Sequence, residues 1–191
     1  MRAIYHLSIK ELKREFIHDL EEQFGDAPVE LAIGSVATGY TLTEEQFWSL
    51  ISLLDWEKLP DEAAVAEPLI QALADAPVRY IYDFYDLMSE KLYALDGAIY
   101  AANIGRGSWQ EGQPFSGDHF LDVRSCAVAN GKEFYQEALR NPKQMPQDTY
   151  FEILPYVPSI AYERKTGRPF IYAPKHNYLT FSNKQGWTDG I

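Results

Sequence analysis

The chain has 191 residues, of which 46% are hydrophobic and 14% aromatic. A chain with this much apolar surface can offset the entropy lost on folding, so the composition excludes intrinsic disorder, and the length fits about one domain. The 17 Lys and Arg residues stand against 28 Asp and Glu, which gives a net charge of −11. We therefore expect neither nucleic acid nor an anionic membrane surface as a partner, because both attract basic proteins.

Three features of the sequence favour a soluble, cytoplasmic protein. The apolar stretches are short, and none reaches the roughly 20 residues that a membrane helix needs. Residues 1–13 carry charges where a signal peptide would have its apolar region. The single cysteine, Cys126, excludes an internal disulfide and cannot build a thiolate zinc site alone.

The first 34 residues predict a small strand–helix–strand element. Residues 2–7 and 29–33 alternate as strands do, and between them apolar residues recur every three to four positions up to Phe24. Gly25 is a typical helix stop, and residues 35–42 follow as a linker. A two-stranded sheet leaves open edges, which can be covered by the same chain or by a second one. We favour the second arrangement, a homodimer built partly through this element.

Residues 43–191 predict a helical domain with an irregular, aromatic-rich C-terminal tail, so the fold class is mainly α (α+β overall). A capping box at Thr43 opens the first helix, Pro68 limits the next, and residues 78–95 form the clearest amphipathic helix. Residues 105–117 form the main loop, and shorter helices follow before a tail that we expect to pack. The predicted core comprises Phe47, Trp48, Leu50, Ile51, Ile81, Tyr85, Met88, Leu92, Phe120 and Val128.

Two stretches of this domain resemble a bacterial family of unknown function, number 4240. The first is Gln46-Phe47-Trp48-Ser49-Leu50-Ile51, and the second is Ser116-Gly117-Asp118-His119-Phe120 followed by Arg124, Gly131, Tyr135, Ala138-Leu139 and Pro142. The resemblance covers about residues 43–172. It implies a mainly helical domain in bacterial cytoplasmic proteins, without an established activity.

The sequence contains none of the common catalytic motifs. It has no H-E-x-x-H, no Cys-x-x-Cys, no nucleophile elbow and no phosphate-binding loop. The weak metal candidates are Asp83, Asp86 and Glu90, whose spacing places them on one side of a helix where they could hold Mg²⁺. Because Arg79 and Lys91 accompany them, we favour a solvent-exposed charged stripe instead.

The candidate binding or structural residues are Trp48, Trp109, Asp118 and Arg124. We expect Asp118 to cap its helix, and Arg124 to reach a carboxylate or carbonyls of another element with its planar guanidinium. Cys126 fits a small buried side chain.

We therefore expect an acidic protein-binding or regulatory module without catalysis and without a cofactor, whose protein partner is basic. The negative charge, the abundant tyrosines and the missing motifs support this interpretation. The alternatives are a Mg²⁺-dependent enzyme with its site on the 78–95 helix, or a small-ligand binder that uses the 105–117 loop as a lid.

Overall fold

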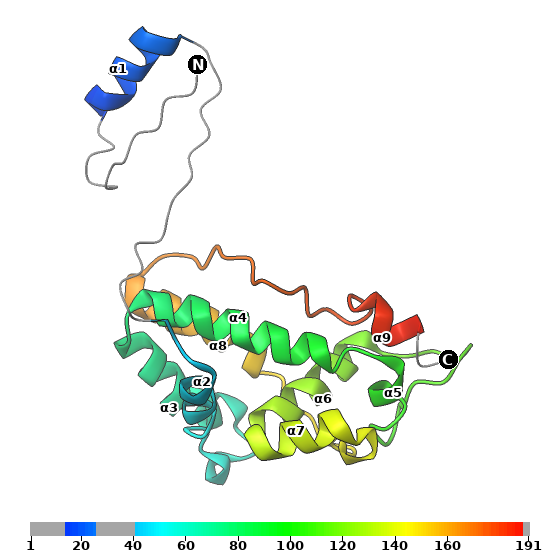
Figure 1. The fold of residues 1–191 in the computed structure, drawn as a ribbon. Helices are drawn as coiled ribbons and strands as arrows, with labels where there is room; N and C mark the ends of the chain where they lie inside the picture. Colours follow the sequence, from blue (N-terminus) through cyan, green and yellow to red (C-terminus); the bar gives the residue numbers. More distant parts are fainter. Residues whose placement is uncertain (1–13, 26–40, 189–191) are drawn as a thin grey trace. The chain divides into compact units, whose positions relative to one another are not determined.

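The computed structural model describes residues 14–25 and 41–188, and all of the regular elements in these ranges are helices (Figure 1). The chain divides into two units, residues 1–38 and 39–191. The mainly helical prediction is confirmed for the described part. The two predicted strands, residues 2–7 and 29–33, lie outside the described residues, as does most of the predicted linker.

The described part of the first unit is α1 (Arg14–Phe24), an amphipathic helix. It ends as predicted at Gly25, whose N–H donates to the carbonyl of Glu21 and whose positive φ of 59° suits glycine.

The second unit contains eight α-helices and three short 3₁₀ turns among its described residues. The α-helices are α2 (Glu44–Ile51), α3 (Glu62–Asp75), α4 (Val78–Ala94), α5 (Ala98–Ala101), α6 (Gly117–Ala129), α7 (Lys132–Arg140), α8 (Val157–Thr166) and α9 (Lys184–Thr188). The 3₁₀ turns are η2 (Trp56–Lys58), η3 (Pro142–Gln144) and η4 (Leu154–Tyr156). We did not predict the short helices α5 and α9.

The core of this unit lies around α4, which contacts α2, α3, α6 and α8. Of the ten predicted core residues, eight are buried, and Leu50 and Tyr85 are partly buried against the same cluster. The core therefore follows from the apolar stripes of the capped helices, which can be covered only by one another.

The start of α2 agrees with the local sequence signal, whereas the interior of α3 does not. Thr43 and Gln46 form the predicted capping box. Our expectation that Pro68 limits its helix is wrong, because α3 continues through it to Asp75. Val65, Leu69 and Leu73 are fully buried on the other face of α3, so their packing offsets the lost backbone hydrogen bond.

The C-terminal segment, residues 167–188, leaves α8 at Gly167 and runs in an extended conformation along α4 (Figure 1). It ends in α9, which packs against α5. From Phe170 to Phe181, partly buried and exposed residues alternate without exception. Such a period of two is typical of an extended segment with one face on a surface. The prediction that this tail packs is thus confirmed.

No helix within residues 14–25 and 41–188 is long and apolar enough to cross a membrane.

Candidate functional site

Four side chains of α4 and α6 and of the turn after α4 hold the C-terminal segment in place. They are Asp86, Ser89, Asp96 and Arg124, which we call the segment-binding surface. Asp86 and Ser89 are three residues apart in α4, so they lie on one face of this helix. That face adjoins the one that carries the apolar core residues. Asp96 follows the C-terminal end of α4, and Arg124 lies in the middle of α6.

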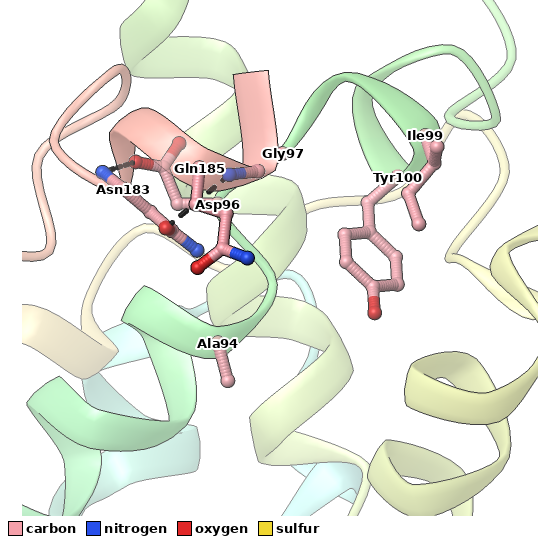
Figure 2. Close-up of a pocket in the computed structure, with 8 residues that line it drawn as sticks. Ala94, Asp96, Gly97, Ile99, Tyr100, Asn183 and Gln185 are labelled. Atoms are coloured by element: carbon pink, nitrogen blue, oxygen red, sulfur yellow. Dashed lines mark hydrogen bonds between the residues drawn. The ribbon is translucent and has the colours of Figure 1, made fainter. Parts of the chain in front are cut away.

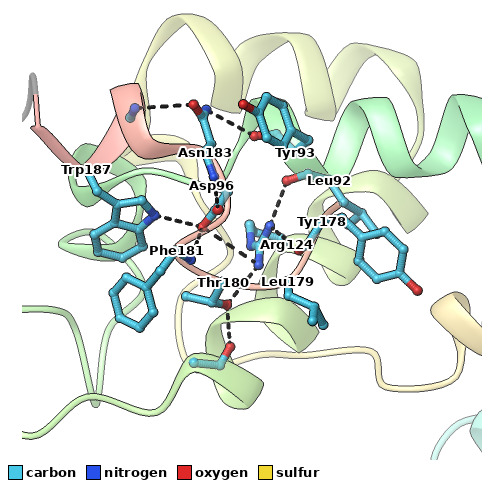
Figure 3. Close-up of polar contacts among 12 residues, drawn as sticks. Leu92, Tyr93, Asp96, Arg124, Tyr178, Leu179, Thr180, Phe181, Asn183 and Trp187 are labelled. Carbon is cyan, nitrogen blue, oxygen red and sulfur yellow. Dashed lines mark hydrogen bonds and ion pairs between the residues drawn. The ribbon is translucent and has the colours of Figure 1, made fainter. Parts of the chain in front are cut away.

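Arg124 is fully buried and connects α4 to the C-terminal segment (Figure 3). Its Nη1 donates to the carbonyls of Leu92, at 2.8 Å, and Tyr178, at 3.1 Å. Its Nη2 donates to Thr180 Oγ1 at 2.9 Å, and the guanidinium lies 4.8 Å from the centre of the Phe120 ring. Burial lowers the pKa of Arg124 to about 10, against the opposing effect of nearby carboxylates. The side chain is therefore still charged at neutral pH.

Asp96 is also fully buried, and its carboxylate accepts three hydrogen bonds from the end of the C-terminal segment (Figure 3). The donors are the backbone N–H groups of Phe181, at 3.2 Å, and Asn183, at 2.9 Å, and the indole Nε1 of Trp187, at 2.9 Å. Three N–H donors replace the hydration that the charged carboxylate loses on burial.

Asp86 and Ser89 bind the segment earlier along its course. Asp86 accepts the phenol of Tyr172 and the backbone N–H of Lys175, both at 3.0 Å, and its carboxylate lies 3.5 Å from Lys175 Nζ. Ser89 Oγ accepts the backbone N–H of His176 at 3.4 Å. Burial, together with the hydrogen bond to Asp86, raises the pKa of Tyr172 to about 12. The phenol therefore stays protonated and donates to the carboxylate.

Aromatic rings pack between these polar contacts. Tyr82 stacks on Tyr172 with 4.6 Å between ring centres, and Tyr85 packs edge-on to Tyr178 at 6.0 Å. The hydroxyls of Tyr85 and Tyr178 are hydrogen-bonded at 3.1 Å. Aromatic side chains with polar tips suit this half-buried setting, because the ring is covered while the hydroxyl finds a partner.

The last turn of the segment approaches the backbone after α4 closely. A Cβ added at Gly186 would lie 2.5 Å from the carbonyl oxygen of Asp96, and one at Gly97 would lie 2.8 Å from the carbonyl oxygen of Gly186. Beside this contact is a cavity of about 270 Å³, lined by both glycines together with Ala94, Asp96, Ile99, Tyr100, Asn183 and Gln185 (Figure 2). It is slightly smaller than typical small-molecule pockets, and the 105–117 loop, our predicted lid, contributes no residue to its lining.

The charged stripe that we expected on α4 is wrong for two of its three members. Asp83 and Asp86 are each only 4% exposed, because other segments cover them. Asp83 accepts the backbone N–H of Leu42 at 3.1 Å and pairs with Arg79 at 2.7 Å, while Glu90 pairs with Lys91 at 2.9 Å. Among the described residues, no group of three or more His, Cys, Asp or Glu side chains is placed to hold a metal ion.

The remaining predicted residues have mixed outcomes. Ser116 caps α6, so the capping role that we assigned to Asp118 is wrong; Asp118 lies in the first turn of the helix. Arg124 does reach carbonyls of other elements, as predicted. Trp48 is buried, Trp109 packs edge-on to Trp187, and Cys126 is a buried free thiol.

The prediction missed Asp96, the residue that receives most bonds from the C-terminal segment. The sequence signal was its position: a lone carboxylate between Leu95 and Gly97, directly after the apolar stripe of α4. Such a residue has to find donors when its neighbours are buried, but nothing in the sequence shows that the donors lie 85 or more residues away.

A second group of charges lies on the exposed side of α6. Burial, together with the nearby carboxylates of Glu152, Asp118 and Glu62, raises the pKa of Asp122 to about 6. Glu62 itself accepts the backbone N–H groups of Glu152 and Ile153. These side chains concentrate negative charge on one part of the surface.

The structure thus defines a mainly helical protein whose buried charges hold an extended polypeptide segment, here its own C-terminus. The chain belongs to the family described as protein of unknown function (DUF4240), whose match covers residues 42–164, more than half of the chain. The segment-binding surface lies within the matched residues, and the C-terminal segment follows them. Comparison with curated proteins and with solved structures gave no match.

Proposed function

We propose that this protein is a protein-binding module without catalysis, which holds extended polypeptide segments on the segment-binding surface. One observation carries the proposal: Asp86, Asp96 and Arg124 each bind main-chain atoms of an extended segment, in addition to the side chains of Tyr172, Trp187 and Thr180. The N–H groups of Lys175, Phe181 and Asn183 and the carbonyl of Tyr178 are bound in this way. The C-terminal segment is the occupant that the chain itself provides.

This arrangement has the two properties of a peptide-recognition surface. Main-chain hydrogen bonds supply affinity that depends little on sequence, and the alternate side chains that face the surface supply specificity. The inward-facing residues of the C-terminal segment include Phe170, Tyr172, Tyr178 and Thr180, which contact α4, α6 or α8. The surface therefore accepts aromatic or hydroxyl side chains at four of the six inward-facing positions from Phe170 to Thr180, and Pro174 and His176 occupy the other two.

The proposal includes a basic protein partner in the bacterial cytoplasm. The net charge of −11 and the carboxylates around Asp122 support a positively charged partner, since a negatively charged surface accelerates encounter with basic proteins. The absence of internal disulfides, fixed by the single cysteine, fits a reducing compartment.

Binding of a labelled peptide tests the proposal. The probe is a fluorescent peptide of residues 167–191, and the receptor is the full chain with Gly186→Ala and Trp187→Ala, which remove the close approach and the indole donor at the end of the internal segment. We expect saturable binding, at least tenfold tighter than to the unsubstituted chain, whose own segment competes.

Two controls keep the result specific. A peptide of the same composition in scrambled order should not bind, and Gln185→Ala, an exposed position beside the same turn, should behave as the unsubstituted chain. Equal affinity for the scrambled peptide, or none for either peptide, contradicts the proposal.

A further inference from the structure

Residues 167–169, which connect α8 to the rest of the C-terminal segment, are exposed. The backbone hydrogen bonds of Gly167 and Arg168 go to residues of α8 itself. Gly167 ends α8 with a φ of 65° and donates to the carbonyl of Glu163, and the N–H of Arg168 donates to Thr166 Oγ1. The polar contacts with α4 begin at Tyr172. A change of backbone direction at residues 167–169 would therefore move the whole segment and leave α8 intact.

The surface beneath the segment cannot be left empty at low cost. Asp96 and Arg124 have no exposed area, and Asp86 is 4% exposed. If the segment moved away, Asp96 would lose three donors and Arg124 two acceptors. Buried charges without partners are strongly unfavourable, so an occupant with the same donors and acceptors in the same order has to replace the segment.

A second copy of this chain carries that occupant. We propose that the C-terminal segment exchanges between two copies, so that the segment of each chain lies on the segment-binding surface of the other. This inference rests on the proposed function, and it names a second copy of the chain, besides the basic partner, as a source of the extended segment. Every contact from Tyr172 to Trp187 is reproduced between the chains, and only residues 167–169 change conformation. Exchange of identical elements is therefore a low-cost way to form a dimer.

The charge of the chain sets the conditions under which the exchanged dimer forms. Two copies with a net charge of −11 each repel one another, and salt screens this repulsion. The dimer should therefore increase with protein concentration and with ionic strength. A basic partner that binds by charge would show the opposite dependence on salt.

A disulfide between α6 and the segment detects the exchange. A Cβ at Gly117 would lie 3.2 Å from the Cβ of Thr180, so a small outward shift of the segment brings the two atoms to the roughly 3.5–4.5 Å separation of disulfides. In a Cys126→Ala background, one chain carries Gly117→Cys and another carries Thr180→Cys. The two are mixed at high concentration and 0.5 M salt, about the strength at which screening is strong, and then oxidised. We expect a covalent heterodimer joined between positions 117 and 180.

Two controls accompany the mixture. The double variant Gly117→Cys with Thr180→Cys should form the same disulfide within one chain at low concentration, which shows that the geometry permits the bond. A mixture of Gly117→Cys with Asn177→Cys, an exposed position on the segment, should give at least fivefold less heterodimer. A mixture of the matched pair that gives no more heterodimer than this control overturns the exchange.

Sedimentation of the unsubstituted chain gives an independent readout. We expect a monomer–dimer equilibrium that shifts towards dimer with salt, and a monomer at every concentration and salt tested overturns the exchange. Failure of the exchange is distinguishable from failure of the proposed function. If the labelled peptide binds while no exchange occurs, the surface still binds extended segments, and only the identity of the partner is wrong.

Discussion

Arg124 Nη2 and Asp96 Oδ1 lie 4.0 Å apart, both without exposed area, yet each makes shorter bonds to the C-terminal segment than to the other. The main hydrogen-bond partners of this pair therefore come from the C-terminal segment, which lies outside the residues matched by the family. Because each charge depends on the segment for its partners, the packing of the segment and the burial of the two charges stabilise one another.

Replacing Arg124 by Met should destabilise the fold by about 3–5 kcal/mol, because it leaves the Asp96 carboxylate buried without its cation. Urea unfolding at pH 7 measures this loss. The double variant with Asp96→Asn should lose less than the sum of the two single variants, because the uncompensated charge is then absent. Strict additivity would mean that the two side chains do not interact.

Replacing Trp187 by Phe should destabilise the fold by about 2 kcal/mol, because the ring is kept while the charge-assisted bond from Nε1 to Asp96 is lost. Urea unfolding again supplies the measurement. Ile171→Ala is the matched control on the same segment: the side chain is 91% exposed, so its removal should change stability by less than about 0.5 kcal/mol. Equal losses in both variants would be inconsistent with the bond to Asp96.

Gly186→Ala should detach the end of the C-terminal segment, because the added Cβ meets the backbone carbonyl of Asp96 at 2.5 Å. Limited trypsin digestion measures the effect through cleavage after Lys175 and Lys184. We expect cleavage at Lys184 at least tenfold faster than in the unsubstituted chain, with Gln185→Ala unchanged. Protection equal to that of the unsubstituted chain would show that the turn accommodates the methyl group.

Asp122→Asn should stabilise the protein at pH 8 by about 1–3 kcal/mol and have little effect at pH 4. The folded pKa of Asp122, about 6, lies above its ordinary value of 3.8. The folded state therefore favours the protonated acid. Its contribution to the free energy of unfolding is complete below pH 3.8 and is lost as pH rises through about 6. Urea unfolding at both pH values tests this sign. Asp118→Asn, at an exposed neighbour, should give a smaller effect, and a larger gain at pH 4 than at pH 8 would refute the assignment.

Trp48→Ala should destabilise the fold by about 3–5 kcal/mol, because the buried ring packs on Phe47 and Tyr135. A urea melt checks the loss, and the exposed Leu53→Ala, two residues after α2, is the control. A loss below about 1 kcal/mol would indicate that neighbouring side chains close the space left by the indole.

The sequence by itself determined the longer helices and most of the core of the second unit, but not the short helices α5 and α9. The capping box at Thr43 and the stripe from Ile81 to Leu92 are local signals, since caps and helical periodicity act over one to three turns. Arg124 was identified instead from the family resemblance, and its planar guanidinium led to the expectation that it reaches other elements. Pro68 was one exception, because burial of the opposite helix face outweighed a local preference, and the cap of α6 was another, because Ser116 supplies it in place of Asp118.

Only the tertiary structure decided which carboxylates are buried and what they bind. Asp86 and Glu90 lie on the same helix, one turn apart, yet Asp86 is covered and Glu90 is exposed, because the C-terminal segment crosses one of them. Asp96 receives its donors from residues 85 to 91 positions further along the chain. Helical periodicity places a side chain on a face of its own helix, but burial of that face depends on which distant segment covers it, and that contact arises from the folding of the whole unit.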